Sequence, residues 1–313
     1  MRGRSKSRIL VTGGVGFIGS HLVRALVREG FGAVTVVDNL HSARLESLHD
    51  VRDQVHFIEG DIRDAHLVRR ACHGINLIFH LAAQSSVMTA AADSTYTSSV
   101  NADGTRVVLE AGIAEGVERV VFTSSREVYG DPPEVPVPET APIAPKNTYG
   151  ISKAQGEEYC RAVAGRITTN IVRLANVYGP GDRDRVVPLF VEAAMANRPL
   201  VLYGGQQVID FVWIESVVEC LMRSGFGPAI DGPLNIGSGK GTTVAKLANR
   251  VIAATGSTSA LEVRPSREIE VSKFVADISR AVTLLGLRPP EDPLFQLDAV
   301  VAATARSLRA ARE

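Results

Sequence analysis

The sequence predicts an α/β protein in which a doubly wound parallel sheet carries a smaller mixed α/β lobe. Three observations predict this class. A short apolar run leads into three glycines and a helix-like segment, and apolar runs then alternate with helix-like segments to about residue 173. After Tyr178 the composition shifts, and a Gly-Pro-Gly triplet opens a region of short mixed elements. We therefore expect one domain over 1–178 and a lobe over 179–313, some segments of which return to the first domain.

Charge and composition exclude several classes of protein. Lys plus Arg total 34 and Asp plus Glu also total 34, so the formal net charge is zero and a nucleic-acid partner is not expected. No apolar run is long enough to span a membrane and no signal peptide is visible, which predicts a cytoplasmic protein with no membrane partner. Cys72, Cys160 and Cys220 lie far apart, so no metal site is expected.

The first element is a strand, a glycine turn and a helix. Ile9 to Val11 form the apolar run, and Gly13, Gly16 and Gly19 follow at intervals of three before the helix-like segment from 20 to 29. Glycine lets the backbone turn sharply and approach a pyrophosphate, whose charge is met by free N–H groups at the helix N-terminus. The stretch predicts a dinucleotide site.

The second apolar run, from Val34 to Val37, indicates which dinucleotide binds. It ends in Asp38, nineteen residues after Gly19, where a dinucleotide-binding fold places an acid against the adenosine ribose. A carboxylate there repels a 2′-phosphate. We therefore predict NAD as the cofactor rather than NADP.

The remaining elements of the first domain continue the alternation. Further strands are expected over 55–58, 75–80, 119–123 and 168–173, and further helices near 64–72, 95–115 and 147–164. The third and fourth strands close in Asp61 and in the alanines Ala82 and Ala83. Since the carboxyl ends of parallel strands share one edge, these residues should reach the cofactor. His80 ends a buried strand and is expected to be a core residue.

The fifth strand and the helix after it carry the predicted chemistry. Ser125 falls where the strand meets the ligand crevice, and Tyr149 and Lys153 stand four apart on one helix face. The pKa of a phenol is about 10, but a nearby ammonium favours the phenolate. We expect Tyr149 to take a proton from a substrate hydroxyl that Ser125 holds, while NAD accepts hydride from the same carbon.

Seven motifs together resemble the extended short-chain dehydrogenase/reductases, and among these the NAD-dependent nucleotide-sugar epimerase/dehydratase family. The resemblance runs from Ile9 to Leu287. The motifs are TGGVGFIG, VVDNL, GDIRD, HLAAQ, TSSREVYG, YGISK and RLANVYGPG.

The resemblance implies a role for individual residues and for the lobe, which would bind substrate. The catalytic set would be Ser125, Tyr149, Lys153 and Glu127. Besides Tyr149 and Lys153, the NAD contacts would be Gly13, Gly16, Phe17, Ile18, Gly19, Asp38, Asn39, Ser42, Asp61, Ile62, Leu81, Ala82 and Ala83. The sugar nucleotide would contact Ser85, Ser125, Arg126, Asn176, Arg185, Tyr203 and Arg264.

Two positions depart from the family pattern. Relatives often carry an arginine that clamps the substrate diphosphate just before an Asp-Phe pair, but this chain has Ile209 there, so Arg264 or Arg267 is expected to supply the charge. In the 4,6-dehydratases an acid pair follows the Ser/Thr, whereas here Arg126 precedes Glu127. Glu127 also fits decarboxylases that act on UDP-glucuronate, or it only hydrogen-bonds within its loop, and Arg126 could face a substrate carboxylate.

The predicted function is NAD-dependent epimerisation at C4 of a UDP-sugar through a 4-keto intermediate. UDP-glucuronate decarboxylation and nucleotide-sugar dehydration, which share the oxidation at C4, are the alternatives, and a non-catalytic NAD-binding sensor is a remote one. Relatives commonly dimerise through the two long helices near 95–115 and 147–164. The resemblance therefore implies a homodimer.

Overall fold

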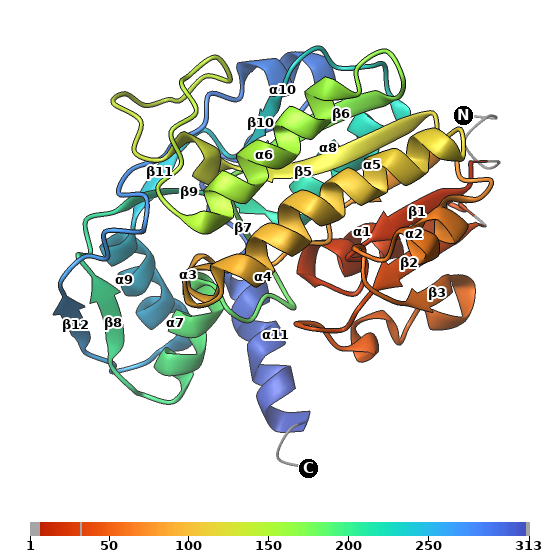
Figure 1. Ribbon diagram of the computed structural model, residues 1–313. Helices are drawn as coiled ribbons and strands as arrows, with labels where there is room; N and C mark the ends of the chain where they lie inside the picture. Colours follow the sequence, from red (N-terminus) through yellow and green to blue (C-terminus); the bar gives the residue numbers. More distant parts are fainter. Residues whose placement is uncertain (1–6, 32, 311–313) are drawn as a thin grey trace.

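A computed structural model describes residues 7–31 and 33–310, and within them a seven-stranded parallel sheet forms the centre of the molecule (Figure 1). The predicted α/β class with a doubly wound sheet is confirmed. The strand order is β10-β6-β5-β4-β1-β2-β3. The strands are β1 (Ile9–Thr12), β2 (Val34–Asp38), β3 (His56–Glu59), β4 (Leu77–His80), β5 (Arg119–Ser125), β6 (Thr168–Leu174) and β10 (Leu234–Ile236).

The sheet is buried on both faces, which is why its strands read as continuous apolar runs. In β1 the side chains of Ile9 and Val11 join the core on one face, and that of Leu10 joins the core on the other. From β1 the chain moves outward to β3 and then crosses back to β4, on the other side of β1. The order therefore reverses between β1 and β4, where α/β sheets bind ligands beyond the carboxyl ends of their strands.

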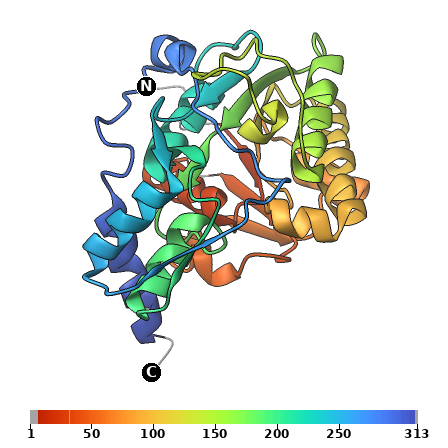
Figure 2. The same ribbon diagram turned by 90° about the vertical axis from the view of Figure 1, so that its left-hand side faces the viewer.

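Helices cover both faces of the sheet (Figure 2). One layer, in which α5 contacts both neighbours, consists of α2 (Ala65–Cys72), α5 (Gly104–Ala114) and α6 (Thr148–Ala162). The other layer, in which α8 contacts both neighbours, consists of α1 (Phe17–Arg28), α8 (Ile214–Phe226) and α10 (Ser279–Leu285).

The helix that was expected over 95–115 runs without a break from 94 to 114 and contains a π-helical turn. It consists of α4 (Ser94–Ser98), the π-helical turn η4 (Ser99–Asp103) and α5, and the short α3 (Val87–Ala92) precedes it. In the wide turn the buried Asn101 side chain accepts a hydrogen bond from Gln84 N and donates to Gln84 O and Ser152 Oγ. The turn thus supports the segment that follows β4, and a sequence period near 3.6 does not reveal it.

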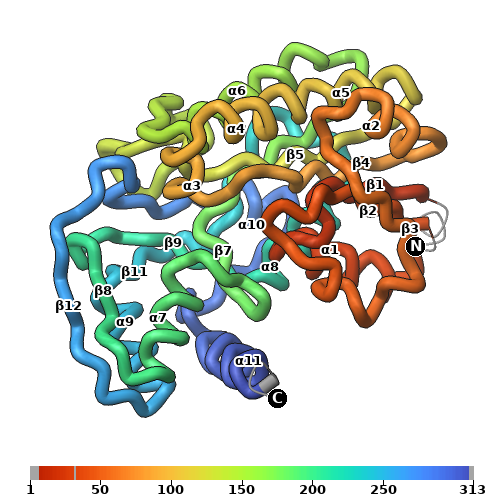
Figure 3. The backbone as a smooth tube through the Cα atoms, turned by 60° about the horizontal axis from the view of Figure 1, so that its bottom comes forward, coloured from red at the N-terminus to blue at the C-terminus, as the bar shows by residue number. Residues whose placement is uncertain are grey.

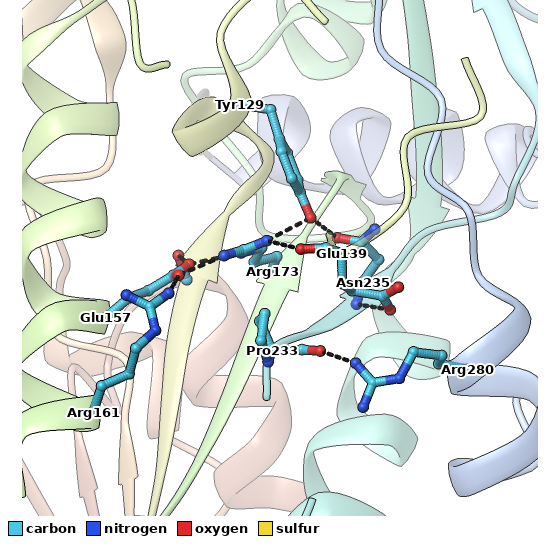
Figure 4. A network of polar contacts seen from close by, with 9 residues as sticks. Tyr129, Glu139, Glu157, Arg161, Arg173, Pro233, Asn235 and Arg280 are labelled. Carbon is cyan, nitrogen blue, oxygen red and sulfur yellow. Dashed lines mark hydrogen bonds and ion pairs between the residues drawn. The ribbon is translucent and has the colours of Figure 1, made fainter. Parts of the chain in front are cut away.

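The seventh strand comes from the second half of the chain and was not among the six expected runs. Leu234 of β10 pairs with Val172 of β6, and α8 packs against the same sheet. A buried polar network anchors this strand (Figure 4). Arg173 of β6 makes two bonds to Glu157 of α6, at 2.8 and 2.6 Å, and donates to the Tyr129 hydroxyl, which donates to Asn235 of β10. Both halves therefore share one core.

The rest of the second half forms two small sheets and three helices (Figure 3). One sheet contains β7 (Asn176–Tyr178), β9 (Val208–Trp213) and β11 (Gly241–Thr243), and the other β8 (Leu200–Tyr203) and β12 (Leu261–Arg264). The helices α7 (Val186–Met195), α9 (Val244–Thr255) and α11 (Leu297–Ala310) contact one another. In 7–31 and 33–310 no helix has the length and apolar character needed to cross a membrane.

Candidate active site

A cavity of about 1550 Å³ lies along the carboxyl edge of the large sheet and extends into the second half of the chain. Pockets for one small ligand measure about 300–1,000 Å³, so this cavity has room for two. It brings together nearly all of the predicted site residues, except Asp61 and Arg264. Those that line it are Gly13, Gly16, Phe17, Ile18, Gly19, Asp38, Asn39, Ser42, Ile62, Leu81, Ala82, Ala83, Ser85, Ser125, Arg126, Glu127, Tyr149, Lys153, Asn176, Arg185 and Tyr203.

The glycine turn packs too tightly to admit side chains. A Cβ on Gly13, whose φ is +70°, would lie 2.6 Å from Ala82 N, and one on Gly19 would lie 2.1 Å from Gly13 O. Helix α1 begins beyond Gly16 with no side chain capping its first N–H groups. These N–H groups and the positive end of the helix dipole face a cradle that suits a pyrophosphate.

Asp38 and its neighbours lie at the end of β2. The half-buried Asp38 carboxylate accepts hydrogen bonds from Val15 N at 3.1 Å and Leu40 N at 3.0 Å. Burial raises the pKa of Asp38, and these backbone N–H groups act in the opposite direction. An acid that spans the glycine turn and the β2 edge is placed to accept hydrogen bonds from ribose hydroxyls.

Asp61 differs from the other predicted cofactor contacts. Its carboxylate is held by Arg63 at 2.8 Å and accepts a hydrogen bond from Asn39 Nδ2 at 3.0 Å. The bonds from Arg63 are the largest cause that lowers the pKa of Asp61, to about 2. Gly60 and Ile62 line the cavity on either side of it. The Asp61 carboxylate thus holds the side chain of Asn39, which lines the cavity, and does not line the cavity itself.

His80 lies behind the carboxyl edge of β4. Its ring is buried between the Thr12 and Thr105 hydroxyls, at 2.7 and 2.9 Å, and burial lowers its pKa to about 3. A neutral histidine bonded on both ring nitrogens is a core residue, as expected. It orders the end of β4, beyond which Ala82 packs against Gly13.

Ser125 and Tyr149 meet in the cavity from the end of β5 and the first turn of α6. Asn147 caps this helix by accepting a hydrogen bond from Gly150 N at 2.8 Å. Burial raises the pKa of Tyr149, while the Arg185 charge and a hydrogen bond from Ser125 lower it. The serine hydroxyl is therefore placed to stabilise the phenolate form of Tyr149.

Lys153 lines the same cavity as Tyr149, as the helical spacing of the two residues predicted. Its ammonium is buried, donates to Thr123 O at 2.9 Å, and lies 5.0 Å from the centre of the Phe122 ring. Burial lowers the pKa of Lys153 to about 8. The charges of Arg185 and Arg126 lower the pKa of Tyr149, and that of Glu127 raises it. The helical spacing placed both residues correctly in the cavity, but it could not show where the ammonium points.

Arg126 and Glu127 form an ion pair in the cavity wall, within the short helix η5 (Arg126–Tyr129). Arg126 Nη2 lies 2.8 Å from Glu127 Oε1, and Asn147 Nδ2 donates to Glu127 Oε2, also at 2.8 Å. The sequence left open whether Glu127 bonds within its loop; one oxygen pairs there with Arg126, and the other accepts a bond from the N-cap of α6.

Arg185 enters the site from the second half of the chain. It precedes α7, pairs with the buried Asp182 at 2.8 Å, and lies 5.7 Å from the centre of the Phe17 ring. Phe17 is the first residue of α1, so Arg185 joins the glycine turn to the second half. Its charge lowers the pKa of Tyr149, and both residues line the same cavity.

The far end of the cavity contains Tyr203 and the arginine that was named as an alternative to Arg264. The Arg267 guanidinium lies 3.5 Å over the Tyr203 ring and pairs with Glu270 at 3.0 Å. Arg264, by contrast, pairs with Glu262 in β12 and does not line the cavity. Ile209 does line it, so of these residues Arg267 is the one placed to compensate for the missing charge.

Two further cavity residues escaped the sequence analysis. Asp182 Oδ2 and Gln207 Oε1 are buried without a hydrogen-bond partner, as is Oδ1 of the predicted residue Asn176. A buried acceptor without a partner is costly, and all three line the cavity where a polar ligand could satisfy them. Among the described residues, no three His, Cys, Asp or Glu side chains gather as a metal site requires.

The fold and this site define the class of the protein. An extended short-chain dehydrogenase/reductase has four features that this chain shares. They are a doubly wound sheet, a glycine turn against a helix N-terminus, an acid at the end of the second strand, and a Ser-Tyr-Lys set in one cavity. The chain belongs to the NAD dependent epimerase/dehydratase family, which matches residues 9–225.

Known proteins resemble nearly the whole chain. It is 37% identical over 294 residues to the UDP-glucose 4-epimerase of Mycolicibacterium smegmatis, covering 90% of this chain and 93% of the relative. It is 34% identical to UDP-glucuronic acid decarboxylase 2 of Arabidopsis thaliana, covering 91% of this chain and 65% of the relative. The structure of the Thermus thermophilus UDP-glucose 4-epimerase in complex with NAD matches with a TM-score of 0.88 and 32% identity, covering 95% and 99%.

Proposed function

We propose that this protein is an NAD-dependent 4-epimerase of a UDP-sugar. The observation that carries the proposal is the meeting of Ser125 and Tyr149 in one cavity with the glycine turn and Lys153. The UDP-glucose 4-epimerases among its relatives support the choice of reaction and of substrate class. Residues 1–178 would hold NAD and most of 179–313 the sugar nucleotide, with β10 completing the large sheet and α8 packing against it.

The cavity residues fit NAD at its two ends. The pyrophosphate would lie against the glycine turn, where a Cβ would take up the space, and at the uncapped N-terminus of α1. The adenosine ribose would bind to Asp38. When bound, NAD supplies a reversible two-electron oxidation of a substrate carbon. The sugar nucleotide would occupy the remaining space, near Arg185, Tyr203 and Arg267.

The chain's own residues would move and hold the proton of the sugar. Tyr149, as phenolate, takes the proton of the 4-hydroxyl, and Ser125 donates a hydrogen bond to the same oxygen. The guanidinium of Arg185 offsets the rise in the Tyr149 pKa that burial causes. The Lys153 ammonium donates a hydrogen bond to Thr123 O and so ties α6 to β5 in the cavity wall. When the ketone turns in the site and is reduced on its other face, Tyr149 returns the proton.

The test is conversion of UDP-galactose to UDP-glucose by the purified holoenzyme. Replacing Tyr149 with Phe removes only the hydroxyl, so we expect the fold to persist and kcat to fall about 10²–10⁴-fold, the usual contribution of a general acid–base group. Unaltered kcat in Tyr149→Phe would refute the assignment. Tyr159→Phe on the same helix is the matched control, since Tyr159 does not line the cavity.

UDP-glucuronate decarboxylation is the second candidate. The relative from Arabidopsis supports it, as do the two arginines, Arg126 and Arg185, that act on Tyr149 and could attract a sugar carboxylate. Mass spectrometry of products from UDP-glucose and UDP-glucuronate separates the candidates. An unchanged mass indicates epimerisation, a loss of carbon dioxide indicates decarboxylation, and a loss of water indicates dehydration.

We also propose a homodimer and a cytoplasmic location. Helices α5 and α6 pack side by side on the outside of the sheet, and the Ile151 side chain on α6 is 54% exposed. We base the dimer on the family resemblance, in which relatives commonly pair through these two helices. The three cysteines are buried and free, which fits a reducing compartment. Light scattering that reports a monomer mass would remove the first proposal.

A further inference from the structure

The Glu127 carboxylate is a base in the cavity wall, and both of its oxygens are bonded to neighbouring side chains. Arg126 holds Oε1 and Asn147 holds Oε2, each at 2.8 Å. The side chains of Arg126 and Glu127 are only 12% and 6% exposed, so bulk water does not weaken the pair much. Asn147 is itself fixed, because it also caps α6 and donates to Ile269 O at 3.1 Å.

In the proposed reaction a free Glu127 carboxylate would cause a side reaction. A ketone at C4 makes the hydrogens on C3 and C5 acidic. A free carboxylate beside such a ketone would remove one of these hydrogens, leaving an enolate at C4 that could be reprotonated on the wrong face. Glu127 lies next to the reacting groups, because its backbone N–H donates to Ser125 Oγ at 3.2 Å and it lines the same cavity as Ser125 and Tyr149.

We propose that Arg126 is a positioning residue that keeps Glu127 from acting as a base on the 4-keto sugar, and so confines the reaction to C4. The inference rests on the proposed function, because it requires a 4-keto intermediate. In a variant without Arg126, the freed carboxylate would take the proton from C3 or C5 and the C4 oxygen would become an enolate. The new carboxylic acid would exchange its proton with solvent and return one to the same carbon.

The experiment measures this exchange without relying on turnover. The holoenzyme is incubated with UDP-4-keto-6-deoxyglucose in D₂O, and deuterium at C3 and C5 is measured by mass spectrometry and NMR. We compare the native protein, Arg126→Met, and Arg126→Met combined with Glu127→Gln. Arg69→Met is the matched control, since Arg69 pairs with Glu115 at 2.8 Å on the surface, with a side chain that is 64% exposed.

We expect Arg126→Met to take up deuterium at least about tenfold faster than the native protein, since a positioned base contributes about 10²–10⁴-fold. The double variant and Arg69→Met should exchange at the native rate. Equal exchange in Arg126→Met and the native protein, or fast exchange that persists in the double variant, would overturn the proposal. Circular dichroism checks the fold, and Arg126→Gln, which also removes the charge, replaces the Met variant if that variant does not fold.

A separate assay distinguishes this failure from failure of the proposed function. If the native protein does not convert UDP-galactose to UDP-glucose, the proposed function fails. If it converts the sugar but Arg126→Met adds no deuterium, only the role of Arg126 fails. During conversion in D₂O, native product should contain no deuterium on carbon, whereas product of the Arg126→Met variant should contain it at C3 or C5.

Discussion

Lys153 should lower the stability of the native fold, and by an amount that depends on pH. Its ammonium is 2% exposed and makes one hydrogen bond, to Thr123 O. Burial lowers its pKa from 10.5 to about 8, so the folded protein binds this proton less tightly than the unfolded chain does. Stability is therefore lost as the pH falls from about 10.5 to about 8, and no more is lost below that. A tenfold change in proton affinity is worth about 1.4 kcal/mol, so the cost at pH 7 is about 3 kcal/mol.

The perturbation that tests this reasoning is Lys153→Met, which keeps the length of the side chain and removes its charge. Urea unfolding of both proteins is followed at several values between pH 7 and pH 10.5. We expect the free energy of unfolding of the native protein, relative to that of Lys153→Met, to rise by about 3 kcal/mol over this range. Other titrating groups cancel in the comparison. A difference that stays flat with pH would refute the reasoning.

Two further predictions concern the core and the cofactor cradle. Arg173→Met should lower the free energy of unfolding, measured in urea, by about 3–5 kcal/mol, because Glu157 is left buried without its main partner. Arg161→Met removes an exposed partner of the same carboxylate and should lower it by about 1 kcal/mol or less. A Cβ on Gly19 would lie 2.1 Å from Gly13 O, so Gly19→Ala should weaken NAD binding at least about tenfold in calorimetric titration, and unchanged affinity would contradict the proposed cradle.

Local sequence was enough to predict the strand, turn and helix that begin the fold. Gly13 and Gly19 are needed because the backbone there has no room for a Cβ, and this requirement is visible as residue type and spacing. Asp38 is likewise the last residue of its strand. The clash at Gly19 and the place of Asp38 depend on residues a few positions away, and the glycine at 13, whose neighbour Ala82 is distant in sequence, is visible as part of the same spacing.

The path of the second half depended on contacts that are distant in sequence. Leu234 pairs with Val172, and the network around Arg173 and Asn235 joins helix, strand and loop. A three-residue strand such as β10 has too few residues for a periodic pattern. Only the packing of the whole chain selects it as the seventh strand.

The sequence by itself determined the fold class, the family and the set of residues that gather at the carboxyl edge. The tertiary structure decided what the charges in that set do. It directed the Lys153 ammonium to Thr123 O, placed Arg185 in the same cavity as Tyr149, and paired Arg126 with Glu127. The physical reason is that residue type and spacing specify backbone geometry and burial, whereas the partner of a charged side chain depends on which distant groups the packed core places around it.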